Sequence, residues 1–199
     1  NDRATLVWLA NQGTIELHPW LSKANNPDFP DRIVVDLDPD PPASWPQVVQ
    51  VARLVKGLLD EMGLASFPKT SGATGLHVYI PVAPRYTYRV TSRFVGFLGK
   101  LIAAHHPRLT TNERLIKRRR GRVYIDHLQN LPGKTIVAPY SLRPQGQPTI
   151  SMPFAWEDLS LIDPKDFTIK NPVPQRDPLQ GMLGLNQTID GFLPLFKED

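Results

Sequence analysis

Proline restricts this chain more than any other residue type, because 21 of the 199 residues are proline. Proline fixes the backbone φ angle, has no N–H donor, and interrupts helix interiors and central strands. The sequence therefore predicts few and well-delimited helices, short strands and a large share of loop. A chain of this length is long enough for one substantial domain, with or without a small appendage.

Apolar residues recur at helical spacing in some stretches and form short β-branched or alternating runs in others. Helices are expected over residues 2–11, from a cap at Ser44 to Gly63, and over 87–105. Strands are expected over residues 14–18, 33–37, 64–69, 76–81, 123–126 and 135–138. This alternation predicts an α/β (α+β) fold. From about residue 151 the chain is rich in proline and is expected to wrap the surface, with weak helical patterns near 155–160 and 177–184.

Two absences narrow the class of protein. No apolar run reaches the roughly 18 residues that a membrane-spanning helix needs, and no signal-peptide pattern opens the chain. Cysteine is absent, which excludes disulfides and thiolate metal sites. A cytoplasmic protein with no membrane partner fits both observations.

The positive charge is concentrated in one segment, residues 114–122. The chain has 23 basic and 19 acidic residues, and without six cations of this segment the balance is 17 to 19. The six are Arg114, Lys117, Arg118, Arg119, Arg120 and Arg122. A local basic segment on a slightly acidic body indicates either a contact with a polyanion or a solvated surface loop, and charge alone does not separate the two.

Two apolar runs end in carboxylates. Asp36 and Asp38 close the run 33–37, and because residues i and i+2 of a strand face the same side, both carboxylates project together. Asp126 closes the run 123–126 in the same way. Hard oxygen ligands of this kind suit magnesium or manganese. Each acid taken alone also fits a turn or a helix cap.

A glycine-rich turn follows the run 64–69. Gly72 and Gly75 allow backbone N–H groups to approach an anion, and Ser71 and Thr74 add hydroxyl groups. The spacing is not that of a Walker loop. His77 follows on the next strand, where it is either a phosphate donor or an ordinary structural histidine.

Further cations and aromatic residues complete the set of candidates. Lys134 and Arg143 flank the run 135–138, which is expected to form a hairpin with 123–126, and either cation could bind a triphosphate or lie on the surface. His18 is another donor beside Trp20, which is as suited to core packing as to base stacking. Three other tryptophans are expected in the core: Trp8, Trp45 and Trp156.

Taken together, these segments resemble the polymerase domain of bacterial ligase D, within the archaeo-eukaryotic primase superfamily. Six motifs match in order and spacing over residues 1 to about 160. They are E-L-H-P-W at 16–20, V-D-L-D-P at 35–39, K-T-S-G-A-T-G-L-H-V-Y at 69–79, V-Y-I-D at 123–126, K-T at 134–135 and Y-S-L-R at 140–143.

The resemblance implies a catalytic core in which two β-sheets flank a metal site, with helices outside. It implies that two divalent ions, manganese or magnesium, are held by Asp36, Asp38 and Asp126. Incoming nucleoside triphosphates would contact His18, Lys69, Ser71, Gly72, Thr74, His77, Lys134, Ser141 and Arg143. The six cations of 114–122 would bind DNA. Members add nucleotides, preferably ribonucleotides, to a primer 3′ hydroxyl during end joining with Ku and a ligase domain, which implies a nucleoid-associated location.

Two departures from the family pattern bear on these expectations. Thr74 stands where many relatives have lysine, so Lys69 is expected to replace that phosphate contact. Relatives also carry an N-terminal module before the point where this chain starts. The expected organisation is a catalytic core over residues 1–160 and a proline-rich segment over 161–199. Two alternatives stay open: a non-catalytic module that binds or bridges DNA ends, and a metal-dependent phosphodiesterase.

Overall fold

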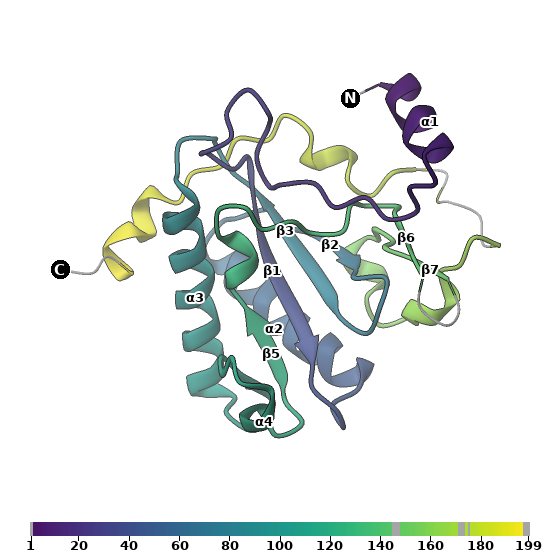
Figure 1. Ribbon diagram of the computed structural model, residues 1–199. Coiled ribbons are helices and arrows are strands. Elements are labelled where there is room, and N and C mark those ends of the chain that lie inside the picture. The colour runs from purple at the N-terminus through teal and green to yellow at the C-terminus, as the bar shows by residue number, and fades with distance from the viewer. Residues whose placement is uncertain (1, 145–147, 171–173, 175, 197–199) are drawn as a thin grey trace.

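A five-stranded sheet forms the centre of the protein, whose computed structural model describes residues 2–144, 148–170, 174 and 176–196 (Figure 1). The strand order is β2-β3-β1-β5-β4. The strands are β1 (Arg32–Pro39), β2 (Phe67–Thr70), β3 (Leu76–Pro81), β4 (Thr110–Thr111) and β5 (Val123–Asp126). All pairings are antiparallel except that of β4 with β5. β1 pairs with β3 along most of its length but with β5 only from Asp36 onward.

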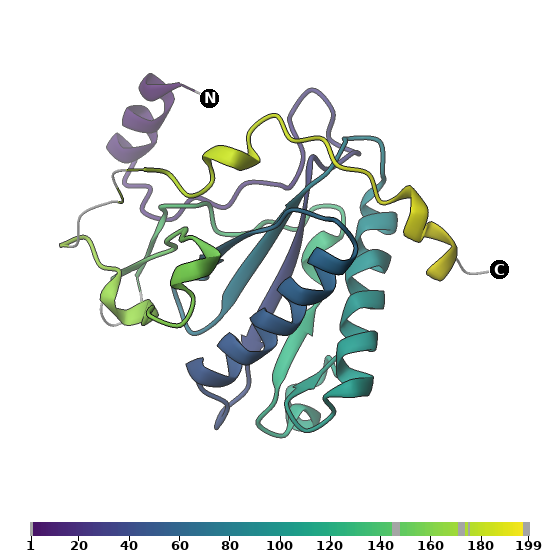
Figure 2. The ribbon, with the colours of Figure 1, turned by 180° about the vertical axis from the view of Figure 1, so that it is seen from behind.

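Two long helices, α2 (Trp45–Glu61) and α3 (Tyr88–His105), cover one face of this sheet (Figure 2). α2 begins as predicted, with the Ser44 N–H donating to Gln47 Oε1 at 2.9 Å, and ends before Gly63, whose φ is +67°. Their apolar sides bury Ile33, Val35 and Leu37 of β1 together with neighbouring residues of β3 and β5. Because strand side chains alternate between faces, the even-numbered residues of β1 point away from the helices.

The opposite face carries a smaller apolar cluster, and a second sheet lies beside the edge strand β2, where the Thr70 N–H donates to Met152 O at 2.9 Å. Val34, Tyr79 and Ile136 lie in this cluster, and β6 (Leu142–Arg143) pairs with β7 (Thr149–Ile150). The fold class is therefore α/β (α+β) as predicted, with two sheets and the helices outside them.

The hairpin expected between 135–138 and β5 does not form. β5 lies between β1 and β4, so both of its edges are occupied. Residues 135–138 instead run beside 17–19, with Ile136 N–H donating to Pro19 O at 3.2 Å and Ala138 N–H to Leu17 O at 2.8 Å. Neither segment is a regular strand, and the expected strand over 14–18 is wrong as well.

The helix α1 (Arg3–Asn11) forms at the predicted place, with Asp2 accepting from the Thr5 N–H, but it extends away from the sheet (Figure 1). None of its residues is buried, and Trp8 is 60% exposed, so its assignment to the core is wrong. Trp45 and Trp156 do pack partly against the core. The amphipathic spacing that predicted α1 is real, but no described segment covers its apolar side.

Short elements fill the remaining chain: α4 (Ile116–Arg119) and the 3-10 turns η1 (Leu128–Asn130), η2 (Trp156–Asp158), η3 (Pro164–Asp166), η4 (Gln180–Met182) and η5 (Asp190–Leu195). The weak helical patterns near 155–160 and 177–184 correspond to η2 and η4. Residues 187–196 return to the sheet, where Val82 bridges to Gln187, Ile189 is fully buried and Phe192 packs against Phe94. The domain boundary at residue 160 stays a prediction. No helix in the described ranges is long and apolar enough to cross a membrane.

Candidate active site

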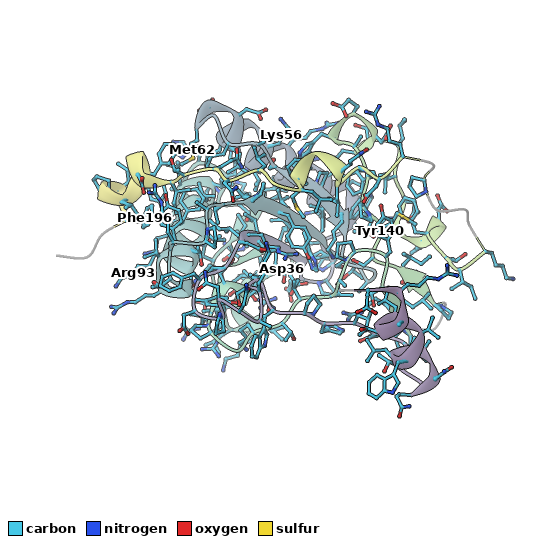
Figure 3. All side chains as sticks on the ribbon, turned by 90° about the horizontal axis from the view of Figure 1, so that it is seen from above. Asp36, Lys56, Met62, Arg93, Tyr140 and Phe196 are labelled. Atoms are coloured by element: carbon cyan, nitrogen blue, oxygen red, sulfur yellow. The ribbon has the colours of Figure 1, made fainter. Side chains whose placement is uncertain are left out.

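Four ionisable side chains form a row across four neighbouring strands, on the face that the long helices leave open. In the strand register, Lys69 of β2 is opposite His77 of β3, His77 is opposite Asp36 of β1, and Asp36 is opposite Asp126 of β5. Residues opposite one another in an antiparallel pair share a face. Asp38 lies one step further along the same face. The structure thus brings together the three predicted carboxylates, and Figure 3 shows Asp36 near the middle of the molecule.

Burial disfavours the charged form of all three carboxylates. Burial raises the pKa of Asp36 to about 6, against the opposing effect of Lys69, Arg119 and Arg143. Burial, with repulsion from Asp36, raises the pKa of Asp38 to about 6 as well, and burial raises the pKa of Asp126. A bound cation would relieve this electrostatic cost.

The carboxylates are not yet arranged around one point. In the described part of the chain, no group of three or more His, Cys, Asp or Glu side chains is positioned to hold a metal ion. Asp126 Oδ1 accepts from the Leu128 N–H at 2.7 Å and from the Tyr124 hydroxyl at 3.1 Å, and His77 Nε2 lies 3.3 Å from Asp36 Oδ1. A cation would therefore have to draw these carboxylates together by side-chain rotation.

Lys69 is fully buried, so its amino group contacts neighbouring residues and not solvent. Its Nζ lies 2.8 Å from His77 Nδ1, 2.5 Å from Ser151 Oγ and 3.5 Å from Thr70 O, which gives each of its three donors an acceptor. Burial lowers the pKa of both Lys69 and His77 well below their ordinary values. The expected contact of Lys69 with a triphosphate is not possible from this buried position. Neutral His77, accepting at Nδ1, presents an Nε2–H toward Asp36.

The turn between β2 and β3 is closed by Ser71, whose Oγ accepts from the Ala73 and Gly75 N–H groups at 3.1 Å each. Both glycines are required by close packing. A Cβ on Gly75 would collide with Leu37 O, and one on Gly72 would lie 2.5 Å from Arg143 Cγ. Because the Ser71 oxygen accepts two bonds, its own O–H remains available to an anion. The predicted Ser-Gly turn and Arg143 are therefore in contact.

Glu16 links two predicted nucleotide contacts, His18 and Arg143. Its Oε2 lies 2.8 Å from His18 Nε2 and its Oε1 3.2 Å from Arg143 Nε. Ser141 Oγ accepts from the Leu17 N–H at 2.9 Å, which holds this segment against the strand that carries Arg143. The preceding Tyr140 has a left-handed backbone with φ +64°.

Two predicted nucleotide contacts, Thr74 and Lys134, are exposed, and neither side chain has a hydrogen bond or ion pair within the described ranges. Their contacts with a nucleotide stay predictions.

The basic segment 114–122 divides into two groups. Arg122 donates to three carbonyls, those of Pro107, Arg118 and Arg119, and so holds α4 in place. Arg119 stacks on the Tyr124 ring at 3.9 Å, and its Nη1 lies 3.9 Å from Asp38 Oδ2. The exposed cations are Arg114, Lys117, Arg118 and Arg120. The first group faces inward, and only the second is presented to solvent.

Sequence reasoning missed two residues of the turn after Asp126. The Gln129 side chain lies close enough to Asp36 to lower the pKa of that carboxyl against the effect of burial. Asn130 is fully buried and binds the backbone of β1 through both atoms of its amide. The only signal in the sequence was a pair of amides shortly after a candidate carboxylate.

A mixed sheet with three carboxylates on one face, beside a Ser-Gly turn and an arginine, defines a primase-polymerase domain. Residues 1–180 match the family described as LigD, primase-polymerase domain, and the chain belongs to this family.

Two curated relatives and one solved structure show the extent of the similarity. The bifunctional non-homologous end joining protein LigD of Bacillus subtilis is 36% identical over an alignment of 201 residues that covers 92% of this chain and 33% of that protein. The multifunctional non-homologous end joining DNA repair protein LigD of Mycobacterium tuberculosis is 39% identical over an alignment of 171 residues that covers 79% of this chain and 22% of that protein. This chain therefore spans a third or less of these relatives.

The solved structure is described as the polymerase domain from Mycobacterium tuberculosis ligase D in complex with DNA. It matches with a TM-score of 0.72 at 32% identity, over 89% of this chain and 61% of that chain. The match supports both the family and the fold.

Proposed function

We propose that this chain is the catalytic core of a nucleotidyltransferase that adds nucleotides to the 3′ hydroxyl of DNA ends. The observation that carries the proposal is the row Lys69–His77–Asp36–Asp126 with Asp38 beside it, on the open face of the sheet. A non-catalytic DNA-binding module gains nothing from three neighbouring carboxylates, because ionised carboxylates repel the phosphates of DNA.

Asp36, Asp38 and Asp126 would hold two divalent cations, manganese or magnesium. Their oxygen donors and uncompensated charge fit such ions. When bound, the cations would supply charge for the attacking hydroxyl and the leaving pyrophosphate. The protein's own contribution is to fix the donors: His77 and Gln129 orient Asp36, and Tyr124 with the Leu128 N–H orients Asp126.

The phosphates of an incoming nucleoside triphosphate would lie between the Ser-Gly turn and Arg143. Ser71 has an O–H to donate, and the aliphatic part of the Arg143 side chain, at Cγ, packs against Gly72 beside it. Arginine binds phosphate oxygens bidentately. Glu16 holds both Arg143 and His18, so a phosphate arriving there would exchange one anionic partner of Arg143 for another. Thr74, in the same turn as Ser71, and Lys134 are exposed and would be free to contact the phosphates.

The DNA would contact the exposed cations of the basic segment. Arg114, Lys117, Arg118 and Arg120 face solvent on a segment that Arg119 ties to the carboxylates. A DNA-bound polymerase domain is among the matching structures. The role in bacterial end joining, the preference for ribonucleotides, the association with Ku and a ligase domain, and the nucleoid as place of action all belong to this proposal.

The test is primer extension on labelled, gapped DNA with manganese, comparing ribonucleotides with deoxynucleotides. An Asp36→Ala/Asp38→Ala protein is the control. Lengthened product that disappears in the control supports nucleotidyl transfer. Shortened DNA would instead favour a phosphodiesterase, and DNA binding without any change in length would favour an end-binding module.

A further inference from the structure

The turn after β5 is attached to β1 by a side chain rather than by a strand. Asn130 Oδ1 accepts from the Val34 N–H at 2.9 Å, and its Nδ2 donates to Val34 O at 2.7 Å. These are the two bonds that a neighbouring strand would make. They are needed because β5 pairs with β1 only from Asp36 onward, which leaves the Val34 backbone without a strand on that side. Buried backbone groups of this kind are costly unless paired.

The same turn carries contacts to two of the three carboxylates. The Leu128 N–H donates to Asp126, and the Gln129 side chain lies close enough to Asp36 to lower the pKa of that carboxyl. The Asn130 amide accepts from the Val34 N–H and donates to Val34 O, two residues before Asp36. The turn also rests on α3, where Ser92 Oγ donates to His127 O at 3.1 Å (Figure 1). Strand pairing with Asp36 fixes the backbone of Asp126. A shift of the turn relative to β1 would therefore move the Leu128 N–H that holds the Asp126 carboxylate, and it would move Gln129 beside Asp36.

We infer that Asn130 is a positioning residue that fixes the distance between the Asp126 carboxylate and the Asp36–Asp38 pair, and through it the affinity for divalent cations. This inference rests on the proposed function, because it assigns Asn130 a role in the same site. Asn130 has no path to substrate, being fully buried, so it acts only through the turn.

The molecule contains a matched control at the other side of the sheet. Gln187 Oε1 accepts from the Ala65 N–H at 2.7 Å, and its Nε2 donates to Ala65 O at 2.9 Å and to Pro81 O at 3.0 Å. Asn130 likewise makes a third bond, from Nδ2 to His127 O at 3.3 Å. Both amides thus pair with one residue's backbone and bridge to a second segment, but only Asn130 adjoins the carboxylates.

The experiment compares Asn130→Asp with Gln187→Glu, each of which replaces the amide donor by an oxygen. Melting temperature, Mn²⁺ affinity by calorimetry, and kcat and KM for primer extension are measured on the full chain. Both variants should lose melting temperature, and Asn130→Asp should lose more because Asn130 is fully buried whereas Gln187 is partly exposed. Mn²⁺ affinity is therefore the quantity that decides. Only Asn130→Asp should lose Mn²⁺ affinity and kcat, by about 10- to 100-fold, as is usual when a group that orients metal ligands is removed, with KM for the nucleotide little changed.

Asn130→Ser provides the milder variant if Asn130→Asp does not fold. Equal Mn²⁺ affinity in the Asn130 variants, Gln187→Glu and the unaltered chain would overturn the inference and leave Asn130 a purely structural residue. If the unaltered chain binds Mn²⁺ but does not extend primers, the proposed function fails while the affinities still decide the role of Asn130. If it does not bind Mn²⁺, both fail.

Discussion

At the scale of single residues, the site depends on ionisable side chains whose burial makes their charged forms unfavourable in free energy. Lys69 has no exposed surface, yet its ammonium is matched by three acceptors, one of them from Ser151, which is far away in the sequence. Asp36 and Asp38 both have pKa values near 6. Such groups are rarely retained for stability alone, because burial penalises their charged forms.

The role of Lys69 can be separated from general stability. Lys69→Met removes the donor to His77 Nδ1 while keeping a side chain of similar length. Primer extension should fall about 10- to 100-fold because the His77 ring is no longer oriented toward Asp36. The melting temperature should hold or rise, since a buried charge is removed. Enzyme kinetics and thermal melts check both, with Lys56→Met, on the surface of α2, as the matched control. Unchanged activity in Lys69→Met would contradict this role.

The raised pKa of Asp38 predicts how stability depends on pH in the absence of divalent cations. Its pKa is about 6 in the folded state and 3.8 ordinarily, so its protonated form stabilises the fold at low pH, and this contribution is lost as pH rises from about 4 through about 6. Asp38→Asn removes the titration. In chelator, the free energy of unfolding of this variant should exceed that of the unaltered chain by about 1 kcal/mol at pH 7, a value discounted because Asp38 is half exposed.

Denaturant titrations at several pH values measure this difference. The difference should shrink as pH falls toward 4 and disappear below about pH 3, where Asp38 is largely protonated in both states. Adding Mn²⁺ at pH 7 should stabilise the unaltered chain more than Asp38→Asn. A difference that does not change with pH would show that the Asp38 carboxyl is not the cause.

Much of the site could be predicted at this scale, and the exceptions share a cause. Asp36, Asp38 and Asp126 were found because each closes an apolar run, a local signal. The phosphate contact predicted for Lys69 came from the family pattern around Thr74, and its burial could not be foreseen because Ser151, one of its acceptors, is distant in sequence. Asn130 was missed for the same reason: its partner is the backbone of Val34, and no sequence pattern marks a backbone group that lacks a strand.

At the scale of elements, the long helices and central strands followed from periodicity, and the errors concern pairing. β1, β3, β5, α2 and α3 were predicted within a few residues. The hairpin between 135–138 and β5 was wrong because adjacency in sequence was taken for adjacency in the sheet, whereas β1 and β4 occupy both edges of β5. Strand order is set by long-range packing, which a single sequence does not display.

The turn between β2 and β3 offers a test of packing at this scale. Gly75→Ala places a Cβ against Leu37 O of the neighbouring strand, so the strands must separate. Unfolding should become easier by about 1–3 kcal/mol, the usual cost of overpacking. Gly57→Ala, in α2 with open space around it, is the control and should stabilise by about 0.5–1 kcal/mol. Chemical denaturation measures both, and equal stabilities would mean that the turn can relax.

At the scale of the whole molecule, residues 187–196 form part of the hydrophobic core and do not only lie on its surface. Ile189 has no exposed surface, and Phe192 and Phe196 pack against Phe94 of α3. The far part of the chain thus closes the same apolar layer that α2 and α3 form over the sheet.

This packing predicts a clear contrast between two aliphatic truncations. Ile189→Ala should cost about 2–5 kcal/mol of unfolding free energy because it leaves a cavity in the core. Leu183→Ala, at a side chain that is 77% exposed, should cost little. Urea denaturation followed by circular dichroism measures both. A small effect of Ile189→Ala would indicate that this segment is held by its hydrogen bonds alone.

The row of ionisable groups has a consequence for how the chain reaches its working state. Its members come from four strands, and the outermost, Lys69 and Asp126, are joined only through the two strands between them. Closing such distant contacts is the slow part of folding for sheet-rich chains. A nascent or partly melted chain therefore has the carboxylates but not their alignment. The proposed nucleotidyl transfer would therefore begin only when all four strands have paired, and incompletely folded molecules would have no activity on DNA.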